Sequence, residues 1–219
     1  MSHLRESFEA VTKERGEDGL AALRERAFGR FEELGFPTTK DEEWLYTNVA
    51  PIAKSDLALG RPSTNGVAAA DVERLGIGGA RSALLVFVDG HYRDDLSETG
   101  AVQVRSLARA LASDRDTVLA HLGRHASIEG LAFVALNTAM MEDGAFVHLP
   151  AGTVLEAPIQ LLHLSTGGKA SHPRHLFVAG ESAEATIVET HASLGEQEPS
   201  SLHADDEQNC PTAATRVAG

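Results

Sequence analysis

The sequence is poor in cysteine and lacks long apolar runs. Its 219 residues include one cysteine, Cys210, so no intramolecular disulfide can form and no multi-cysteine site can be built from this chain alone. No stretch approaches the ~20 consecutive apolar residues of a membrane-spanning helix, and the first residues alternate charged with apolar side chains, unlike a signal sequence. These absences lead us to expect a protein of the reducing cytoplasm.

Positive charge is scarce as well. Lysine and arginine together number 19 against 32 aspartates and glutamates, which gives a formal net charge of −13 at pH 7. Such a surface repels phosphate backbones and anionic lipid heads, so we predict that neither nucleic acid nor a membrane is a partner. Hydrophobic residues make up 42% of the chain, which is enough to form a globular core.

Helical periodicity marks the first part of the chain. Apolar residues recur at three- and four-residue steps and stop at the Gly-Phe-Pro of residues 35–37, which predicts two amphipathic helices. Thr39 and Glu42 have the spacing of a capping box, which predicts a short helical turn carrying Trp44. We therefore expect a helical N-terminal domain over residues 1–60.

Residues 61–130 are predicted to be a mixed α/β connecting region. Its first residues are small and turn-prone. The apolar run over residues 82–88, followed by Asp89-Gly90, predicts a buried strand and then a turn. Leucine and valine at helical spacing between residues 106 and 122 predict one or two short helices.

From residue 131 the pattern changes to short β-prone runs bounded by Gly, Pro or Asn. This punctuation fits a barrel, a jelly roll or a stacked β-helix, each of which protects its strand edges. The runs are too unevenly spaced for a hexapeptide solenoid, so periodicity alone leaves the architecture of residues 131–195 open. The runs are FVALN, GAFVHLP, APIQLLHLS, RHLFVAG and ATIVETH.

Residues 196–219 have almost no large apolar residue and no alternation. We therefore predict a disordered tail that adds no strand. An open stack of strands needs further strands or a cap over its last edge, and this tail supplies neither. We expect the chain to be cut short, with an open β edge at ATIVETH through which copies could self-associate.

Histidines in the β region raise the question of a metal site. His148, His163, His175 and His191 lie in or beside the β runs, and histidine is the commonest metal ligand. The segment GAFVHLPAGTVL resembles the second motif of metal-binding cupins, but Leu155 stands where the ligand histidine belongs and the first motif has no counterpart upstream. We therefore predict no metal ligand. The alternative is a cupin-like metal-dependent enzyme that uses His148, His163 or His191.

Common catalytic motifs are absent too. The sequence contains no phosphate-binding glycine loop with a following Lys-Ser/Thr and no Gly-x-Ser-x-Gly nucleophile elbow. We therefore predict a protein without catalytic residues and assign no cofactor-binding residue.

Three stretches, in order along the chain, match the motifs of one known family. The first comprises Gly35, Pro37, Lys40, Glu42, Trp44, Tyr46 and Thr47. The second comprises Ala135-Leu136-Asn137, Ala139, Asp143-Gly144 and Pro150-Ala151-Gly152. The third comprises His172-Pro173-Arg174, Gly180, Ile187, Glu189 and Ser193. Together they resemble the N-terminal half of the SufD type of the SufB/SufD family, subunits of the SUF system of iron–sulfur cluster assembly.

The resemblance implies an α+β fold in which a helical N-terminal domain precedes the first rungs of a right-handed parallel β-helix over residues 131–195. Its β runs would then stack as parallel rungs, with the strand at residues 82–88 outside the stack. In that arrangement GAFVHL and IQLLHL do not pair as a hairpin.

The resemblance also implies a non-catalytic scaffold subunit. Its partners would be a SufB-like paralogue and a SufC-like ATPase, and a transient iron–sulfur cluster would form only on the full complex. The family's docking helices and cluster-forming residues lie beyond this chain, so no site residue is carried over, and Cys210 in the atypical tail is not assigned as a ligand. A SufB-type paralogue is a further alternative, disfavoured by the first motif.

Overall fold

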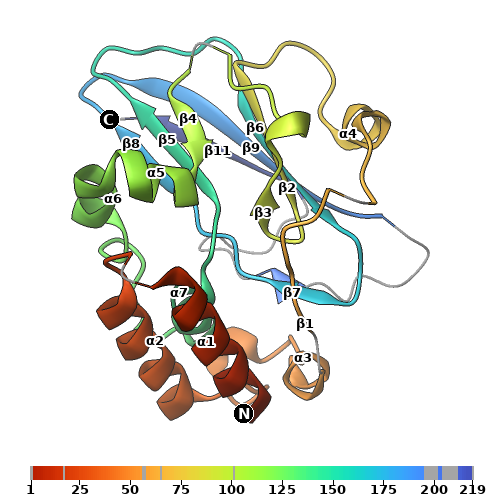
Figure 1. The fold of residues 1–219 in the computed structure, drawn as a ribbon, viewed down its shortest axis with the longest axis vertical. Coiled ribbons are helices and arrows are strands. Elements are labelled where there is room, and N and C mark those ends of the chain that lie inside the picture. The colour runs from red at the N-terminus through yellow and green to blue at the C-terminus, as the bar shows by residue number, and fades with distance from the viewer. Residues whose placement is uncertain are drawn as a thin grey trace.

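The computed structural model describes residues 2–16, 18–55, 58–64, 66–100, 102–194, 202–203 and 212–218. The longest helices gather at one end of the molecule, and most of the strands lie at the other end with shorter helices beside them (Figure 1). The fold is therefore α+β, as predicted, with N-terminal helices followed by small sheets. No helix within these ranges is both long enough and apolar enough to cross a bilayer.

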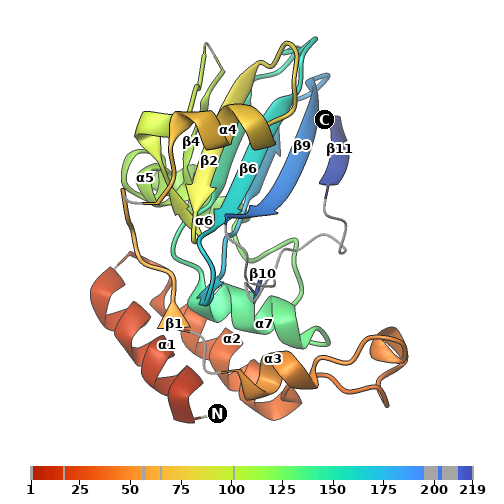
Figure 2. The same cartoon turned by 90° about the vertical axis from the view of Figure 1, so that its right-hand side faces the viewer.

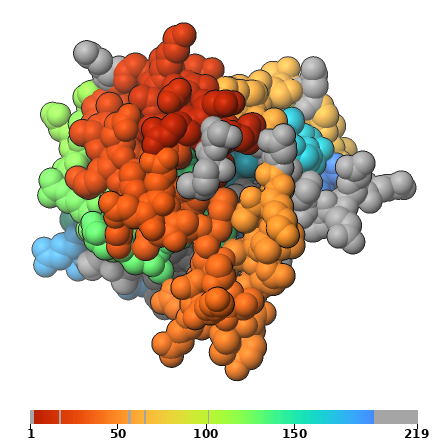
Figure 3. Space-filling view, turned by 90° about the horizontal axis from the view of Figure 1, so that it is seen from below, coloured from red at the N-terminus to blue at the C-terminus, as the bar shows by residue number. Residues whose placement is uncertain are grey.

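The N-terminal helices α1 and α2 confirm the two amphipathic helices predicted from the apolar spacing. Phe8 of α1 and Phe28 of α2 stack with their ring centroids 4.3 Å apart, and Phe31 is buried beside them. Side chains of these helices make up much of the face seen in Figure 3. The helices span Ser2–Arg15 and Ala21–Leu34.

A further helix of this end, α7, corrects one prediction. FVALN, residues 133–137, is not a strand but part of α7, Ala132–Met140. Leu136 and Met140 lie one helical turn apart and are buried in the same apolar cluster as Phe28 of α2. A continuous apolar run does not distinguish a buried strand from a buried helix, and here packing against α2 decides for the helix.

Shorter helices connect the main elements. The turn predicted at Trp44 forms as a 3-10 helix, and its indole ring packs 5.1 Å from the ring of Phe133. Asp41, rather than Thr39, precedes the turn and accepts the backbone N–H of Thr38 at 2.7 Å. The short helices are η1 (Glu42–Trp44), α3 (Ala50–Lys54), α4 (Ala69–Leu75), η2 (Asp94–Leu96), α5 (Leu107–Ser113) and α6 (Arg115–His121).

The strands of the described ranges form three sheets, with the orders β4-β5-β8, β11-β9-β6-β2-β3 and β1-β7-β10. Strands β5, β6, β8 and β9 confirm four of the predicted β runs. The strands are β1 (Ala58–Leu59), β2 (Ala83–Val88), β3 (His91–Tyr92), β4 (Val104–Ser106), β5 (Ala145–Leu149), β6 (Ile159–Ser165), β7 (Lys169–Ser171), β8 (Leu176–Ala179), β9 (Glu184–Ser193), β10 (Leu202–His203) and β11 (Thr212–Ala218).

Parallel pairing dominates the β region. β5 pairs in parallel with β8, and β6 pairs in parallel with β9. GAFVHL and IQLLHL belong to β5 and β6, which lie in different sheets. The predicted absence of a hairpin between these two runs is therefore confirmed.

Strand β2 joins the sheet of β6, so the prediction that it lies outside the stack is wrong. It pairs in parallel with β6, with Leu85 beside Leu161. All of its residues are buried, which is typical of a central strand covered on both faces. The predicted turn forms at Asp89 and Gly90, whose φ angles of 48° and 87° link β2 to β3.

Two strands of the C-terminal segment correct the prediction that residues 196–219 add none. β11 pairs antiparallel with β9 over Glu184–Thr190, and β10 pairs in parallel with β7. The unpaired backbone N–H and C=O groups of an edge strand can pair with any extended segment, even one made of small residues. The edge of β9 predicted to promote self-association is therefore covered along these residues. Cys210 and the remaining tail residues lie outside the described residues.

The five-stranded sheet and the β4-β5-β8 sheet enclose an apolar interior, and helices cover their outer faces. Helix α4 lies over the outer face of β2 and β6 (Figure 2). Its Val72 and Leu75 pack against apolar side chains of these two strands. Apolar side chains of α5 and α6 cover the outer face of β5 and β8. The apolar interior includes Leu85, Val104, Val147, Leu149, Ile159, Leu161 and Ile187.

Candidate functional site

A ladder of three rings crosses the five-stranded sheet. His163 of β6 lies in register between Phe87 of β2 and His191 of β9. Its ring stacks on that of Phe87 at 5.0 Å and on that of His191 at 4.6 Å, with interplanar angles of 12° and 11°. Paired residues of a parallel sheet project from the same face, so the register itself aligns the three rings.

A carboxylate joins the two histidines. Glu189 lies two residues before His191 on β9, so both side chains project from the same face of the sheet. Its Oε1 atom lies 3.1 Å from the Nε2 atom of His163 and 3.1 Å from that of His191. Because Ile187, two residues further back, belongs to the apolar interior, the carboxylate lies at the end of that interior.

A third histidine reaches the same carboxylate from the other sheet. His175 immediately precedes β8, and its Nε2 atom lies 3.3 Å from Oε1 of Glu189 and 3.2 Å from Nε2 of His163. The backbone N–H of Ala145 donates to its Nδ1 atom at 2.9 Å. A neutral ring that accepts at Nδ1 carries its proton on Nε2, so His175 donates toward the carboxylate. We call these four residues, His163, His175, Glu189 and His191, the histidine–glutamate cluster.

Burial sets the electrostatics of the cluster. The side chain of His163 is 1% exposed and that of Glu189 is 16% exposed. Burial raises the pKa of Glu189, but hydrogen bonds with His163, His175 and His191 outweigh it and hold that pKa well below its usual range. The carboxylate is therefore ionised, and the surrounding imidazoles stabilise its charge.

Three members of the cluster could hold a metal ion. The ligand atoms of His163, Glu189 and His191 all lie within 4.8 Å of one another. Two imidazoles and a carboxylate are a ligand set used by zinc and by non-haem iron. His175 already donates from Nε2 and accepts at Nδ1, which suits it to orient the carboxylate rather than to bind a metal.

His148, the other histidine of the cupin-like alternative, lies elsewhere. Its neighbours Val147 and Leu149 on β5 face the apolar interior, so His148 projects from the opposite face, near Phe146. The structure thus brings together His163 and His191 of the sequence candidates and excludes His148. Sequence reasoning missed the role of Glu189, although the alternation in Glu-Thr-His over residues 189–191 indicates one shared face.

The second and third family stretches meet in space. The side-chain amide of Asn137 donates to the carbonyl of Pro173 at 2.8 Å, and the guanidinium of Arg174 donates to the hydroxyl of Thr138. A Cβ atom on Gly144 would lie 1.9 Å from the carbonyl oxygen of Arg174, so only glycine fits there. These contacts are structural, and they position the segment that carries His175.

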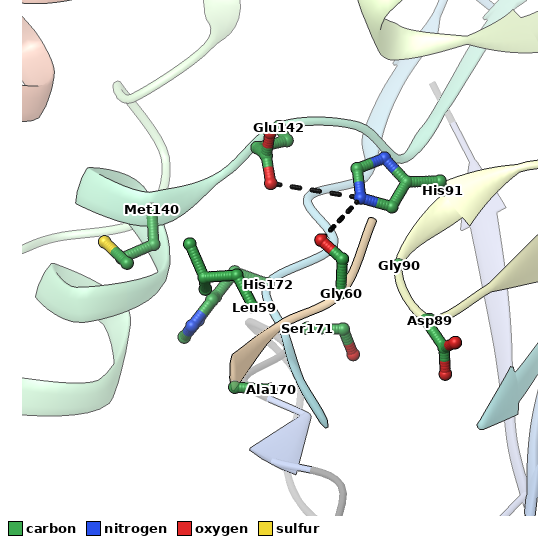
Figure 4. Close-up of a pocket in the computed structure, with 10 residues that line it drawn as sticks. All are labelled: Leu59, Gly60, Asp89, Gly90, His91, Met140, Glu142, Ala170, Ser171 and His172. Carbon is green, nitrogen blue, oxygen red and sulfur yellow. Dashed lines mark hydrogen bonds and ion pairs between the residues drawn. The ribbon is translucent and has the colours of Figure 1, made fainter. Parts of the chain in front are cut away.

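A small cavity lies between β1, β7, α7 and the turn after β2 (Figure 4). Its volume of about 10 Å³ is the space that one water molecule needs. The Nε2 atom of His91 lies 3.1 Å from the carbonyl oxygen of Gly60 and 3.9 Å from a carboxylate oxygen of Glu142. His172 also lines this cavity, and burial lowers the pKa of His172 to about 4. This cavity is too small for a metabolite.

Comparisons with known proteins agree with the resemblance. The family model described as the SufBD protein N-terminal region matches residues 2–161 of the 219. An iron–sulfur cluster assembly SufBD family protein of Synechocystis sp. is 32% identical over 183 residues, which cover 80% of this chain and 40% of that protein. The iron–sulfur cluster assembly protein SufD of Escherichia coli K12 is 27% identical over 169 residues, which cover 74% of this chain and 37% of that protein. The chain thus spans about two fifths of the length of these relatives.

Proposed function

Because this chain belongs to the SufB/SufD family, we propose that it acts in iron–sulfur cluster assembly as a non-catalytic scaffold subunit. The observation that carries the proposal is the family match over residues 2–161. Similarity to the SufD of E. coli favours the SufD type over the SufB type. Its partners in the cytoplasm are a SufB-like paralogue and a SufC-like ATPase, and the cluster itself is a transient product held by the full complex.

We also propose that the β region is the start of a right-handed parallel β-helix. Its support is the order of pairing: β5 pairs with β8, β6 with β9 and β7 with β10, always in parallel. Each of β5, β6 and β7 therefore lies beside the strand three further along, as in a coil with three strands per turn. In this proposal residues 1–60 form the helical domain, residues 61–130 connect it, and residues 131–195 begin the coil.

A strain that lacks the gene tests the function. We expect the activity of several unrelated iron–sulfur enzymes to fall while their protein levels stay the same, and the intact gene to restore it. A tagged copy expressed from its own gene should retain the SufB-like paralogue on purification. Unchanged iron–sulfur enzyme activity together with no retained paralogue would contradict the proposal.

The cupin-like alternative has less support. A jelly roll would pair GAFVHL with IQLLHL, and these runs lie in different sheets. His148 also projects away from His163 and His191, so the three histidines named for that alternative do not share a site.

A further inference from the structure

We propose that His163, Glu189 and His191 form a binding site for one divalent transition-metal ion, Zn²⁺ or Fe²⁺, with His175 as a positioning residue. This site is independent of the proposed scaffold function, because it rests on the side chains of this chain alone. It differs from the cupin-like alternative in its ligands, since Glu189 takes the place of His148.

The spacing of the ligand atoms suits a small ion. Metal–nitrogen and metal–oxygen bonds of ~2.1 Å at tetrahedral angles place neighbouring ligand atoms ~3.4 Å apart. Oε1 of Glu189 lies 3.1 Å from Nε2 of each of the two histidines. These two distances are close to that spacing, and all three ligand atoms lie within 4.8 Å of one another.

The backbone holds the three ligands in place. His163 and His191 are paired across parallel strands, and Glu189 precedes His191 by two residues on the same strand. Phe87 closes one side of the stack by lying against the ring of His163. Ligands on paired strands are positioned more rigidly than ligands on loops, so little conformational entropy is lost when an ion binds.

The chemistry of the ligand set defines the ion. Two imidazoles and one carboxylate suit Zn²⁺ and Fe²⁺, whereas soft ions such as Cu⁺ prefer thiolates, and the chain's single cysteine is Cys210. The ion's positive charge would also offset the negative charge of the Glu189 carboxylate, whose side chain is only 16% exposed. Three protein ligands leave a fourth coordination position for water or another ligand.

His175 supports the site from outside the ligand shell. Its Nδ1 atom is held by the backbone N–H of Ala145, and its Nε2 atom faces Oε1 of Glu189. A hydrogen bond to a ligating carboxylate fixes its orientation, and losing such a partner lowers metal affinity by roughly 10–100-fold.

The test is a calorimetric titration of the metal-stripped 219-residue chain with Zn²⁺, repeated with Fe²⁺ without oxygen and with Co²⁺ as a spectroscopic probe. We expect one equivalent to bind. Glu189→Gln and His191→Gln should each lower the affinity by at least ~10-fold, because each removes a ligand. His175→Gln should keep the one-to-one stoichiometry but weaken binding, and it should shift the Co²⁺ visible spectrum.

His148→Gln is the matched control, since it changes a half-buried histidine on the other face of β5. Its affinity should equal that of the unchanged chain. Circular dichroism confirms folding of each variant. If Glu189→Gln does not fold, His191→Gln tests the site by itself, because His191 is the most exposed of the three ligands. No stoichiometric binding by the unchanged chain, or equal affinity in the unchanged chain and in folded His191→Gln, would overturn the proposal.

Discussion

The same strands build an apolar interior over most of their length and a polar cluster at one end. On β6, Ile159 and Leu161 face the apolar interior, and His163, the next residue on that face, belongs to the histidine–glutamate cluster. On β9, Ile187 faces the interior and Glu189 follows it. The same face of the same paired strands therefore carries both an apolar interior and a polar cluster. The type of side chain at each position decides which of the two forms.

The two regions are stabilised differently. Burying a leucine or isoleucine contributes ~1.5–3 kcal/mol without any specific partner. A buried carboxylate is unfavourable unless charged or hydrogen-bonding partners surround it, and Glu189 has three imidazoles around it. The apolar interior should thus tolerate changes of shape, whereas the cluster should depend on the identity of each member.

The largest effect should come from the apolar interior. Leu161→Ala should lower the free energy of unfolding by ~2–5 kcal/mol, because it leaves a cavity where the fully buried Leu161 side chain was. Urea unfolding followed by circular dichroism measures this change. Val154→Ala, at a valine that is 61% exposed, should change stability by less than ~0.5 kcal/mol. Equal losses in the two variants would mean that the region between the sheets is not a packed core.

A smaller effect should come from the cluster. In metal-free buffer, Glu189→Gln should lower the free energy of unfolding by ~1–3 kcal/mol, because the buried imidazoles lose their charged acceptor while the side-chain volume stays the same. The same unfolding assay applies, with Glu181→Gln in an exposed turn as the neutral control. A Glu189→Gln variant as stable as the control would show that the carboxylate contributes nothing to folding and would remove the difference between the two regions.

The smallest effect should come from an ion pair just beyond the end of β2. Oδ2 of Asp89 lies 2.7 Å from Nζ of Lys169, and Oδ1 accepts the backbone N–H of Thr166 at 2.8 Å. Burial raises the pKa of Asp89, but hydrogen bonds from Lys169 and Thr166 outweigh it, so the pKa is lowered overall. A lowered pKa stabilises the fold above the unfolded value of about 3.9, and this contribution is lost as the pH falls through the folded pKa.

We therefore expect the free energy of unfolding of the unchanged chain, measured with urea, to fall between pH 6 and pH 3 by more than that of Asp89→Asn. The difference should be on the order of 1 kcal/mol or less, because Lys169 is 35% exposed and solvent screens the pair. Identical pH profiles for the two chains would show that this ion pair, unlike the buried cluster, does not contribute to stability.

Much of the fold follows from sequence pattern. The amphipathic spacing predicted α1 and α2, the turn chemistry of Asp89-Gly90 predicted the end of β2, and four β runs matched strands. These predictions succeeded because each depends on contacts between near neighbours in the chain. FVALN failed because a short, wholly apolar segment has no periodicity of its own and folds as the surface of α2 requires.

The sequence by itself determined the family, the two N-terminal helices, and the positions of β2, β5, β6, β8 and β9. Alternation along a strand also showed which of its residues share a face, but not which face lies against the interior. Only the tertiary structure decided that β2 pairs with β6, that β11 covers β9, and that His175 reaches Glu189 from the other sheet. Alternation along a strand is local and can be read from neighbouring residues. Which strands become neighbours depends on contacts between distant segments, and those contacts create the histidine–glutamate cluster.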